Sequence, residues 1–178
     1  MKNAYALALL GLLLLPVLSA AGQTNAAGSL PGVLLTVLDG VKAKTKVDVL
    51  LPTTLPKNLS NAKHANVDKA TADEYAISLY YELDAGNAGF AASFHATHDP
   101  RHSPLKLRDV REIKLASGIT GFFRPVSCGG SCAPADLWWK RGATLYQIQL
   151  KLPSTLGEKN QQQIIESVAN SAILAGPR

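Results

Sequence analysis

Two closely spaced cysteines are the residues of this sequence with the clearest chemistry. Cys128 and Cys132 enclose a Gly-Gly-Ser segment between two stretches with strand-like alternation. In an exported chain such a pair forms a disulfide, and a ring this short shapes a loop more than it stabilises a domain. Gly129 and Gly130 supply the backbone freedom that a tight ring can require. We therefore predict a structural disulfide.

A redox-active or metal-binding pair is the alternative for these cysteines. Thioredoxin-type centres place two residues between the cysteines at a helix N-terminus, which lowers the thiol pKa. Here three residues intervene, and the neighbouring segments are predicted strands. Two thiolates also fall short of the four ligands of a structural zinc site.

Three histidines lie close together along the chain. His95, His98 and His102, with Asp99 among them, could gather imidazole ligands of the kind that bind zinc or copper. Their spacing matches no zinc signature, and the segment is a polar loop with two prolines. We predict neither a metal nor a cofactor, and these histidines are the alternative metal site.

Catalytic arrangements are weakly represented. Ser131 lies between Gly130 and Cys132, outside the strand–turn–helix setting of a hydrolase serine. Carboxylate pairs such as Asp73 and Glu74 fall at predicted turns, and the sequence holds no glycine-rich phosphate loop. The sequence predicts a protein that is not an enzyme.

Adjacent tryptophans mark a candidate binding surface. Trp138 and Trp139 are neighbours on one predicted strand, so their side chains point to opposite faces of the sheet. With Tyr146 and Phe123, they are the predicted contacts for an apolar or peptide ligand. Further aromatic residues line a cavity if the sheet curls, namely Tyr75, Tyr81, Phe90, Phe94 and Phe122. The alternative is that all of them are core residues.

The first 21 residues have the pattern of a signal peptide. Lys2 precedes an apolar run from Ala4 to Leu15, and Ser19-Ala20-Ala21 offers a small-residue cleavage site. The run is shorter than the roughly 20 apolar residues of a membrane-spanning helix. We expect export to the periplasm or the extracellular space, with no membrane span after cleavage; an uncleaved anchor is the alternative.

The rest of the chain predicts one domain. Residues 22–29 form a small, polar lead-in, and residues 30–178 form a single α+β domain of a size that can enclose a core. The formal net charge of +5 comes from scattered residues, which argues against a nucleic-acid partner.

Alternation and turn residues predict about six strands between two helices. The periodicity predicts an N-terminal helix ending near Lys42 and a C-terminal helix, capped by Ser154 or Thr155, ending near Ala175. Between them, we expect a weak strand over 62–70 and three hairpins over 74–96, 111–126 and 135–152.

The segment from Gly118 onward carries a family resemblance. Gly118-x2-Gly121-x-Phe123, the Cys128–Cys132 loop, and Trp139-x2-Gly142-x3-Tyr146 before a late helix resemble small uncharacterised exported bacterial proteins. They are also similar to the extracytoplasmic half-barrel domains of unknown function on anti-sigma factors and to lipoprotein-carrier-like proteins.

This resemblance implies a curved antiparallel sheet, half-barrel-like, with the N- and C-terminal helices packed on its concave side. It also implies a binding role for lipid or protein. With the sequence features above, we predict a non-enzymatic binding or accessory protein of the bacterial cell envelope, with a lipid, a peptide or an envelope protein as partner. We predict that an apolar or peptide ligand lies on the concave sheet face. The alternative is a protein-interaction module that docks a partner through a sheet edge or the Cys128–Cys132 loop.

Overall fold

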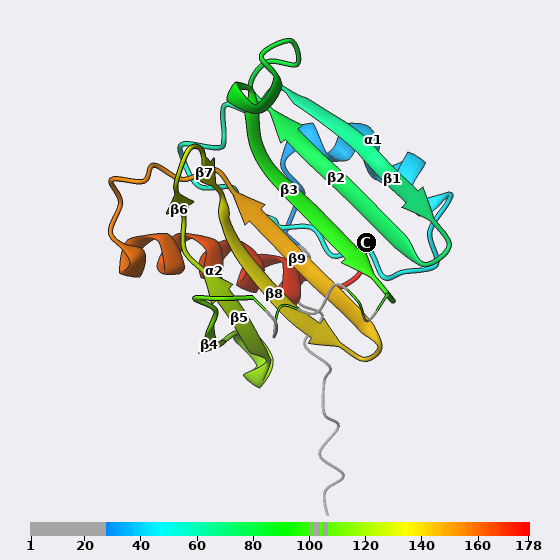
Figure 1. The fold of residues 1–178 in the computed structure, drawn as a ribbon. Helices are drawn as coiled ribbons and strands as arrows, with labels where there is room; N and C mark the ends of the chain where they lie inside the picture. Colours follow the sequence, from blue (N-terminus) through cyan, green and yellow to red (C-terminus); the bar gives the residue numbers. More distant parts are fainter. Residues whose placement is uncertain (1–27, 100, 102–103, 105–106) are drawn as a thin grey trace, which may run out of the picture.

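The computed structural model describes residues 28–99, 101, 104 and 107–178. The predicted signal peptide, most of the lead-in and His102 lie outside the described residues. The described chain is an α+β fold with a seven-stranded antiparallel sheet, a two-stranded hairpin and two α-helices (Figure 1). None of the helices in these described ranges is long and apolar enough to cross a membrane.

The main sheet has the order β1-β2-β3-β9-β8-β5-β4, in which all neighbours run antiparallel. The three predicted hairpins are confirmed as β2–β3, β4–β5 and β8–β9, and the weak candidate is strand β1. The strands are β1 (His64–Thr71), β2 (Glu74–Tyr80), β3 (Phe90–Thr97), β4 (Arg111–Lys114), β5 (Thr120–Arg124), β8 (Ala135–Arg141) and β9 (Thr144–Leu150). The cysteine loop adds a small separate hairpin of β6 (Ser127–Cys128) and β7 (Cys132–Ala133).

Both helices lie behind the same face of the sheet in Figure 1. Helix α1 (Gly32–Lys42) packs on β1, and helix α2 (Glu158–Ala175) packs on β8 and β9. Alternate strand residues join buried helix residues in one core, for example Leu34, Ile77, Phe94, Leu137 and Ile165. Burial of this apolar surface is the main force that holds the helices on the sheet.

Helix α2 starts later than the capping pattern predicts. Its N-cap is Gly157, so Ser154 and Thr155 lie in the turn before the helix, and no side chain caps its first turn. The buried Gln161 side chain instead links this region to the segment between β5 and β6: its Nε2 donates to the Leu156 carbonyl, and its Oε1 accepts from the Val126 N–H. The helix ends at Ala175, and its C-cap residue Gly176 has a φ of 73°, which suits glycine.

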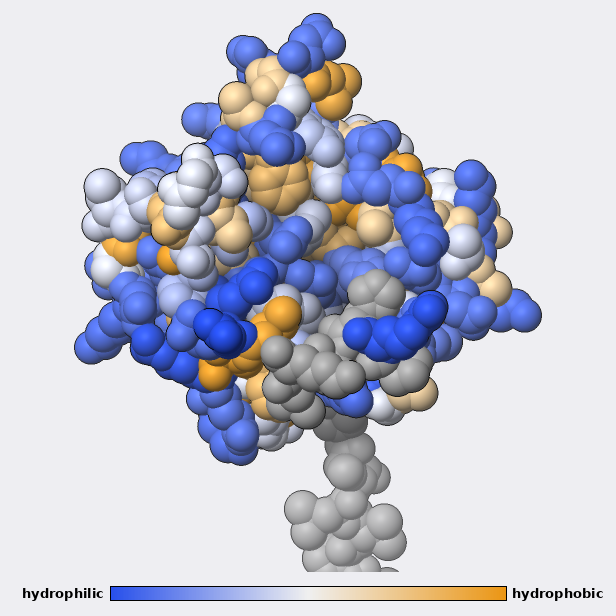
Figure 2. All heavy atoms as spheres, viewed as in Figure 1, coloured by the Kyte–Doolittle hydropathy of each residue, from blue (hydrophilic) through white to orange (hydrophobic). Residues whose placement is uncertain are grey.

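The opposite face of the sheet carries neither helix, and we call it the open face. Hydrophilic side chains cover most of it, with a smaller apolar area near its centre (Figure 2). Both edges of the sheet are protected against further strand pairing. The register of β1 shifts between Val67 and Lys69, and β4 is four residues long and carries Arg111, Glu112 and Lys114. Bulges, shortness and charge are the usual devices that prevent an edge strand from recruiting another chain.

Candidate functional site

Trp138 and Trp139 occupy opposite faces of the sheet, and both are buried. Trp139 belongs to the core between sheet and helices, whereas Trp138 lies on the open face beneath the Arg124 guanidinium. Only 3 % of Trp138 and 1 % of Trp139 is exposed. Neither ring is therefore presented to a partner on a flat exposed surface.

Three of the four predicted ligand contacts are core residues. Trp139 stacks on Tyr146 with ring centroids 5.4 Å apart, and Phe123 is fully buried. The Tyr146 hydroxyl donates to the Asp48 carbonyl, and burial, followed by the charge of Asp48, raises the pKa of Tyr146. All three side chains belong to the core, and the Tyr146 bond ties the sheet to the segment that follows α1. The indole N–H of Trp139 is buried there without a hydrogen-bond partner.

The fourth residue, Trp138, belongs to a polar network on the open face. Arg124 places its guanidinium carbon 5.4 Å from the Trp138 ring centre and donates two N–H groups to Asp136. Asp136 is fully buried, and its other oxygen accepts from Gln147 at 2.8 Å and Gln149 at 2.6 Å. Both carboxylate oxygens are thus satisfied, which is what a buried charge requires.

This network extends across the sheet. Ser93 on β3 donates to the Gln149 amide oxygen at 3.1 Å, and its register partner Ser78 on β2 donates to Asp68 at 2.5 Å. The open face is therefore built from side chains that already bind one another. Such hydrogen-bonded side chains hold one another in fixed orientations.

Two of the three candidate metal-binding histidines are described, and they contact different partners. His95 on β3 contacts the Glu74 carboxylate at 2.9 Å on the open face. His98, after the end of β3, contacts Thr144 Oγ1 at 3.1 Å and the Asp73 carboxylate at 3.5 Å. Among the residues that the structure describes, no group of three metal-ligating side chains comes together.

Cys128 and Cys132 form the predicted disulfide, which closes the β6–β7 hairpin. The register pairs the two cysteines directly, with Ser127 opposite Ala133. All four are exposed. Neither Gly129 nor Gly130 has a positive φ, so the expected need for glycine-specific angles is wrong at these two positions.

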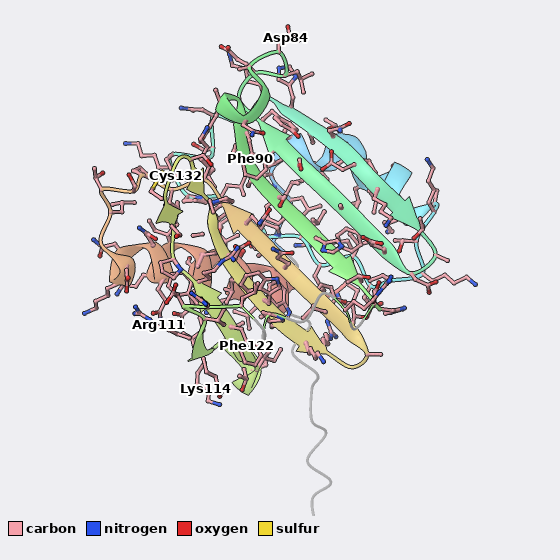
Figure 3. The ribbon with its side chains drawn as sticks, viewed as in Figure 1. Asp84, Phe90, Arg111, Lys114, Phe122 and Cys132 are labelled. Atoms are coloured by element: carbon pink, nitrogen blue, oxygen red, sulfur yellow. A yellow bond between two sulfur atoms is a disulfide. The ribbon has the colours of Figure 1, made fainter. Side chains whose placement is uncertain are left out.

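A cavity of about 440 Å³ lies beside this hairpin. Figure 3 shows Cys132 on the hairpin and Phe90 at the start of β3, toward the same end of the sheet. The cavity is lined by Asn87, Phe90, Val126, Ser131, Cys132, Ala133, Pro134, Lys151, Leu152 and Ser154. Its volume falls within the range of roughly 300–1,000 Å³ that is typical of small-molecule sites.

The cavity wall is mostly apolar, with polar groups at a few places. Phe90 makes an edge-to-face contact with Tyr80 at a centroid distance of 6.1 Å, which fixes its ring on the open face. Leu152 is buried and also belongs to the core, so one wall of the cavity rests on the rigid part of the domain. An apolar wall with few polar groups is the usual composition of a ligand site.

Strand pairing brings together cavity residues that are distant in the sequence. The Lys151 N–H donates to the Ala91 carbonyl at 2.9 Å, which sets the end of β9 beside the start of β3. The sequence marks Phe90 as an aromatic candidate, but it does not single out Lys151, Leu152 or Pro134. Lys151 and Leu152 fall at the end of the predicted 135–152 hairpin, and Pro134 lies just before it, which is their only sequence signal.

Two further hollows line helix α2. One of about 570 Å³ lies between α2 and the Thr54–Pro56 segment, and one of about 590 Å³ continues from Thr54 toward Leu174. Both are more open to solvent than the cavity beside the hairpin, although apolar side chains such as Leu156 and Ile164 line much of the first. The cavity beside the hairpin is better shaped to hold a small ligand.

No protein-family model, no curated protein and no solved structure matches this chain. Its function is therefore inferred from the geometry of the site.

Proposed function

We propose that this chain is an exported, non-enzymatic binding or accessory protein of the bacterial cell envelope, which holds an apolar or peptide ligand. The observation that carries the proposal is the cavity between the β6–β7 hairpin and Phe90. Its aromatic and aliphatic wall suits an apolar group, and its position at the end of the open face leaves it accessible.

The site lies on the open face rather than between the sheet and the helices. The space between the sheet and the helices is filled by buried side chains of α1, α2 and the strands. These include Trp139, Tyr146 and Phe123. A ligand there would have to displace the core of the domain. We also propose that the sheet is curved and half-barrel-like, as the family resemblance implies.

Docking through the cysteine loop is the second candidate, and the exposure of the disulfide hairpin favours it. Docking through a sheet edge has less support, because the bulge in β1 and the charges on β4 both oppose strand addition. Because the hairpin also forms one wall of the cavity, a partner that inserts an apolar side chain would use the same site.

Ligand binding can be tested by filling the cavity. Ala133 lies on its wall, so Ala133→Trp should block it, while Ala43→Trp places the same ring on an exposed residue after α1. We expect native mass spectrometry of the protein from its own host to detect a co-purifying ligand in wild type and in Ala43→Trp, but not in Ala133→Trp.

A solution titration gives the same test with a defined probe. In heteronuclear NMR, 1-octanol should shift the backbone signals around Phe90 and Leu152 in wild type and in Ala43→Trp only. If wild type has neither a co-purifying ligand nor any shift with octanol, the proposed binding function is wrong.

A further inference from the structure

Among the described residues, Lys151 is a cation at the cavity for which no anionic partner is found. The Lys151 ammonium donates to two backbone carbonyls, of Asn87 at 3.0 Å and of Ala88 at 2.7 Å. None of the ion pairs between described residues includes Lys151. The carbonyls fix the position of the ammonium, but they carry no full charge that could neutralise it.

The two carbonyls belong to a rigid turn. Residues Gly86–Ala88 form the short 3-10 helix η1 before β3, and the next residue, Gly89, packs so closely that an added Cβ would lie 2.0 Å from the Glu82 carbonyl oxygen. The N–H of Tyr81 also donates to the Gly89 carbonyl at 2.8 Å. Lys151 is therefore held against a well-defined part of the backbone. An ammonium carries three N–H groups, so one is left for a further acceptor.

Other polar groups line the same cavity. Asn87, Ser131 and Ser154 contribute side chains that can donate hydrogen bonds, whereas the rest of the lining is largely apolar. A ligand that satisfies both parts has an apolar body and an anionic end. Carboxylates and ammonium groups form charge-assisted hydrogen bonds, which are stronger than those between neutral groups.

We infer that the cavity selects an amphiphile with a carboxylate end, with the carboxylate bound at Lys151 and the apolar part against Phe90 and Leu152. This inference rests on the proposed function and specifies its ligand class. The carboxylate belongs either to an alkyl carboxylic acid or to the C-terminus of a short apolar peptide, and the two sources share the same recognition chemistry.

A headgroup series tests the inference. Octanoate, 1-octanol and octylammonium present the same chain with an anionic, a neutral and a cationic end. NMR titration should give the tightest binding for octanoate and the weakest for octylammonium. Octanoate should bind about fivefold more tightly than octanol, which is the contribution expected of a partly exposed ion pair. Added salt should weaken octanoate binding and leave octanol binding unchanged.

Substitutions at Lys151 separate the charge from the cavity. Lys151→Gln should lower octanoate affinity about fivefold to the level of octanol, whereas Lys151→Arg should keep the preference for the carboxylate. Lys159→Gln removes one charge from an exposed position on α2 and should leave all three affinities unchanged. Acetylated Ala-Leu with a free carboxylate, compared with its amide, distinguishes the peptide source from the alkyl acid.

The outcomes keep the two proposals distinct. Equal binding of octanoate and octanol in wild type and in Lys151→Gln would overturn the carboxylate inference while leaving apolar binding in place. Binding of none of the probes would overturn the binding function itself. Preference for the carboxylate that survives Lys151→Gln but is lost in Lys159→Gln would assign the anion to a different part of the surface and so reject the Lys151 site.

Discussion

The Asp136 carboxylate on β8 accepts the Nε–H of Arg124 on β5 at 3.0 Å and a second N–H from the same guanidinium. Asp136 is fully buried, while the Arg124 side chain is 26 % exposed. This pair lies on the face of the sheet that neither helix covers. A buried carboxylate in such a place needs its partners, because removing one leaves an uncompensated charge.

Arg124→Met should therefore destabilise the protein by about 3 kcal/mol, the lower end of what breaking a buried ion pair costs. Arg111→Met is the matched control, because Arg111 pairs with Glu158 and both side chains are more than half exposed. That pair should contribute less than about 1 kcal/mol. Urea denaturation gives both free energies of unfolding, and equal losses would contradict the role of burial.

Tyr75 and Tyr81 provide a second matched comparison. The buried Tyr75 hydroxyl donates to the Leu50 carbonyl and accepts from the Leu50 N–H, both at 3.1 Å. Tyr75→Phe leaves two buried backbone groups unsatisfied, so we expect a loss of about 2 kcal/mol. The Tyr81 hydroxyl bonds to the Asn58 carbonyl at a solvent-exposed position, where water can replace it, and Tyr81→Phe should cost less than about 1 kcal/mol. Comparable losses in thermal unfolding would argue against this interpretation.

Local patterns in the sequence predict the hairpins well, because alternation and turn residues act over a few neighbouring positions. Gly142, with a φ of 59°, lies in the β8–β9 turn that the Arg-Gly dipeptide indicates. The pairing of β3 with β9 cannot be read in this way, because it joins residues distant in the chain. Most of the site depends on that pairing, since it sets Lys151 beside Ala91.

The opposite orientation of Trp138 and Trp139 follows from strand geometry and is confirmed, whereas their role depends on tertiary packing. No sequence pattern shows that Arg124 and Asp136 will pair over Trp138, because the register between β5 and β8 decides it. The same register places Gly121 opposite Trp139. Residue types alone therefore mark candidates, and the sheet order decides which of them share a site.

Gly121 on β5 is required for close packing rather than for a special backbone angle. A Cβ at this position would lie 2.8 Å from Leu115 Cδ1 and 3.2 Å from Leu137 Cδ1. Gly121→Ala should destabilise the protein by about 1–3 kcal/mol through overpacking. At Gly129, an added Cβ meets open space, so Gly129→Ala should change stability by less than about 0.5 kcal/mol. Chemical denaturation of the two variants checks this contrast.

Glu74 makes the stability of the sheet dependent on pH. Burial alone would raise the pKa of Glu74, but hydrogen bonds and charge from Lys69 at 2.6 Å and His95 at 2.9 Å outweigh it and lower the pKa. A carboxyl group whose pKa is lower in the folded state stabilises the fold fully above its unfolded pKa. That contribution is lost as the pH falls through the folded pKa.

Glu74→Gln should therefore be less stable than wild type at neutral pH, and the difference should shrink as the pH falls below about 4. Urea midpoints measured across this range test the sign. Glu112→Gln, on the exposed edge strand β4, should give a smaller difference at every pH. If the difference in stability between wild type and Glu74→Gln instead grew as the pH fell, the lowered pKa of Glu74 would be contradicted.

The Cys128–Cys132 disulfide should matter more for the cavity than for the fold. Its ring is short, so replacing both cysteines by alanine should cost at most about 2 kcal/mol, which corresponds to a fall of about 5 °C in the unfolding temperature. The hairpin lies outside the seven-stranded sheet, and the domain should remain folded without it. Cys132 and Ala133 form part of the cavity wall, however, so loosening the hairpin should weaken octanoate binding measurably. Reduction of the wild-type protein should reproduce both effects, and a double variant that unfolds completely would show instead that the hairpin is integral to the core.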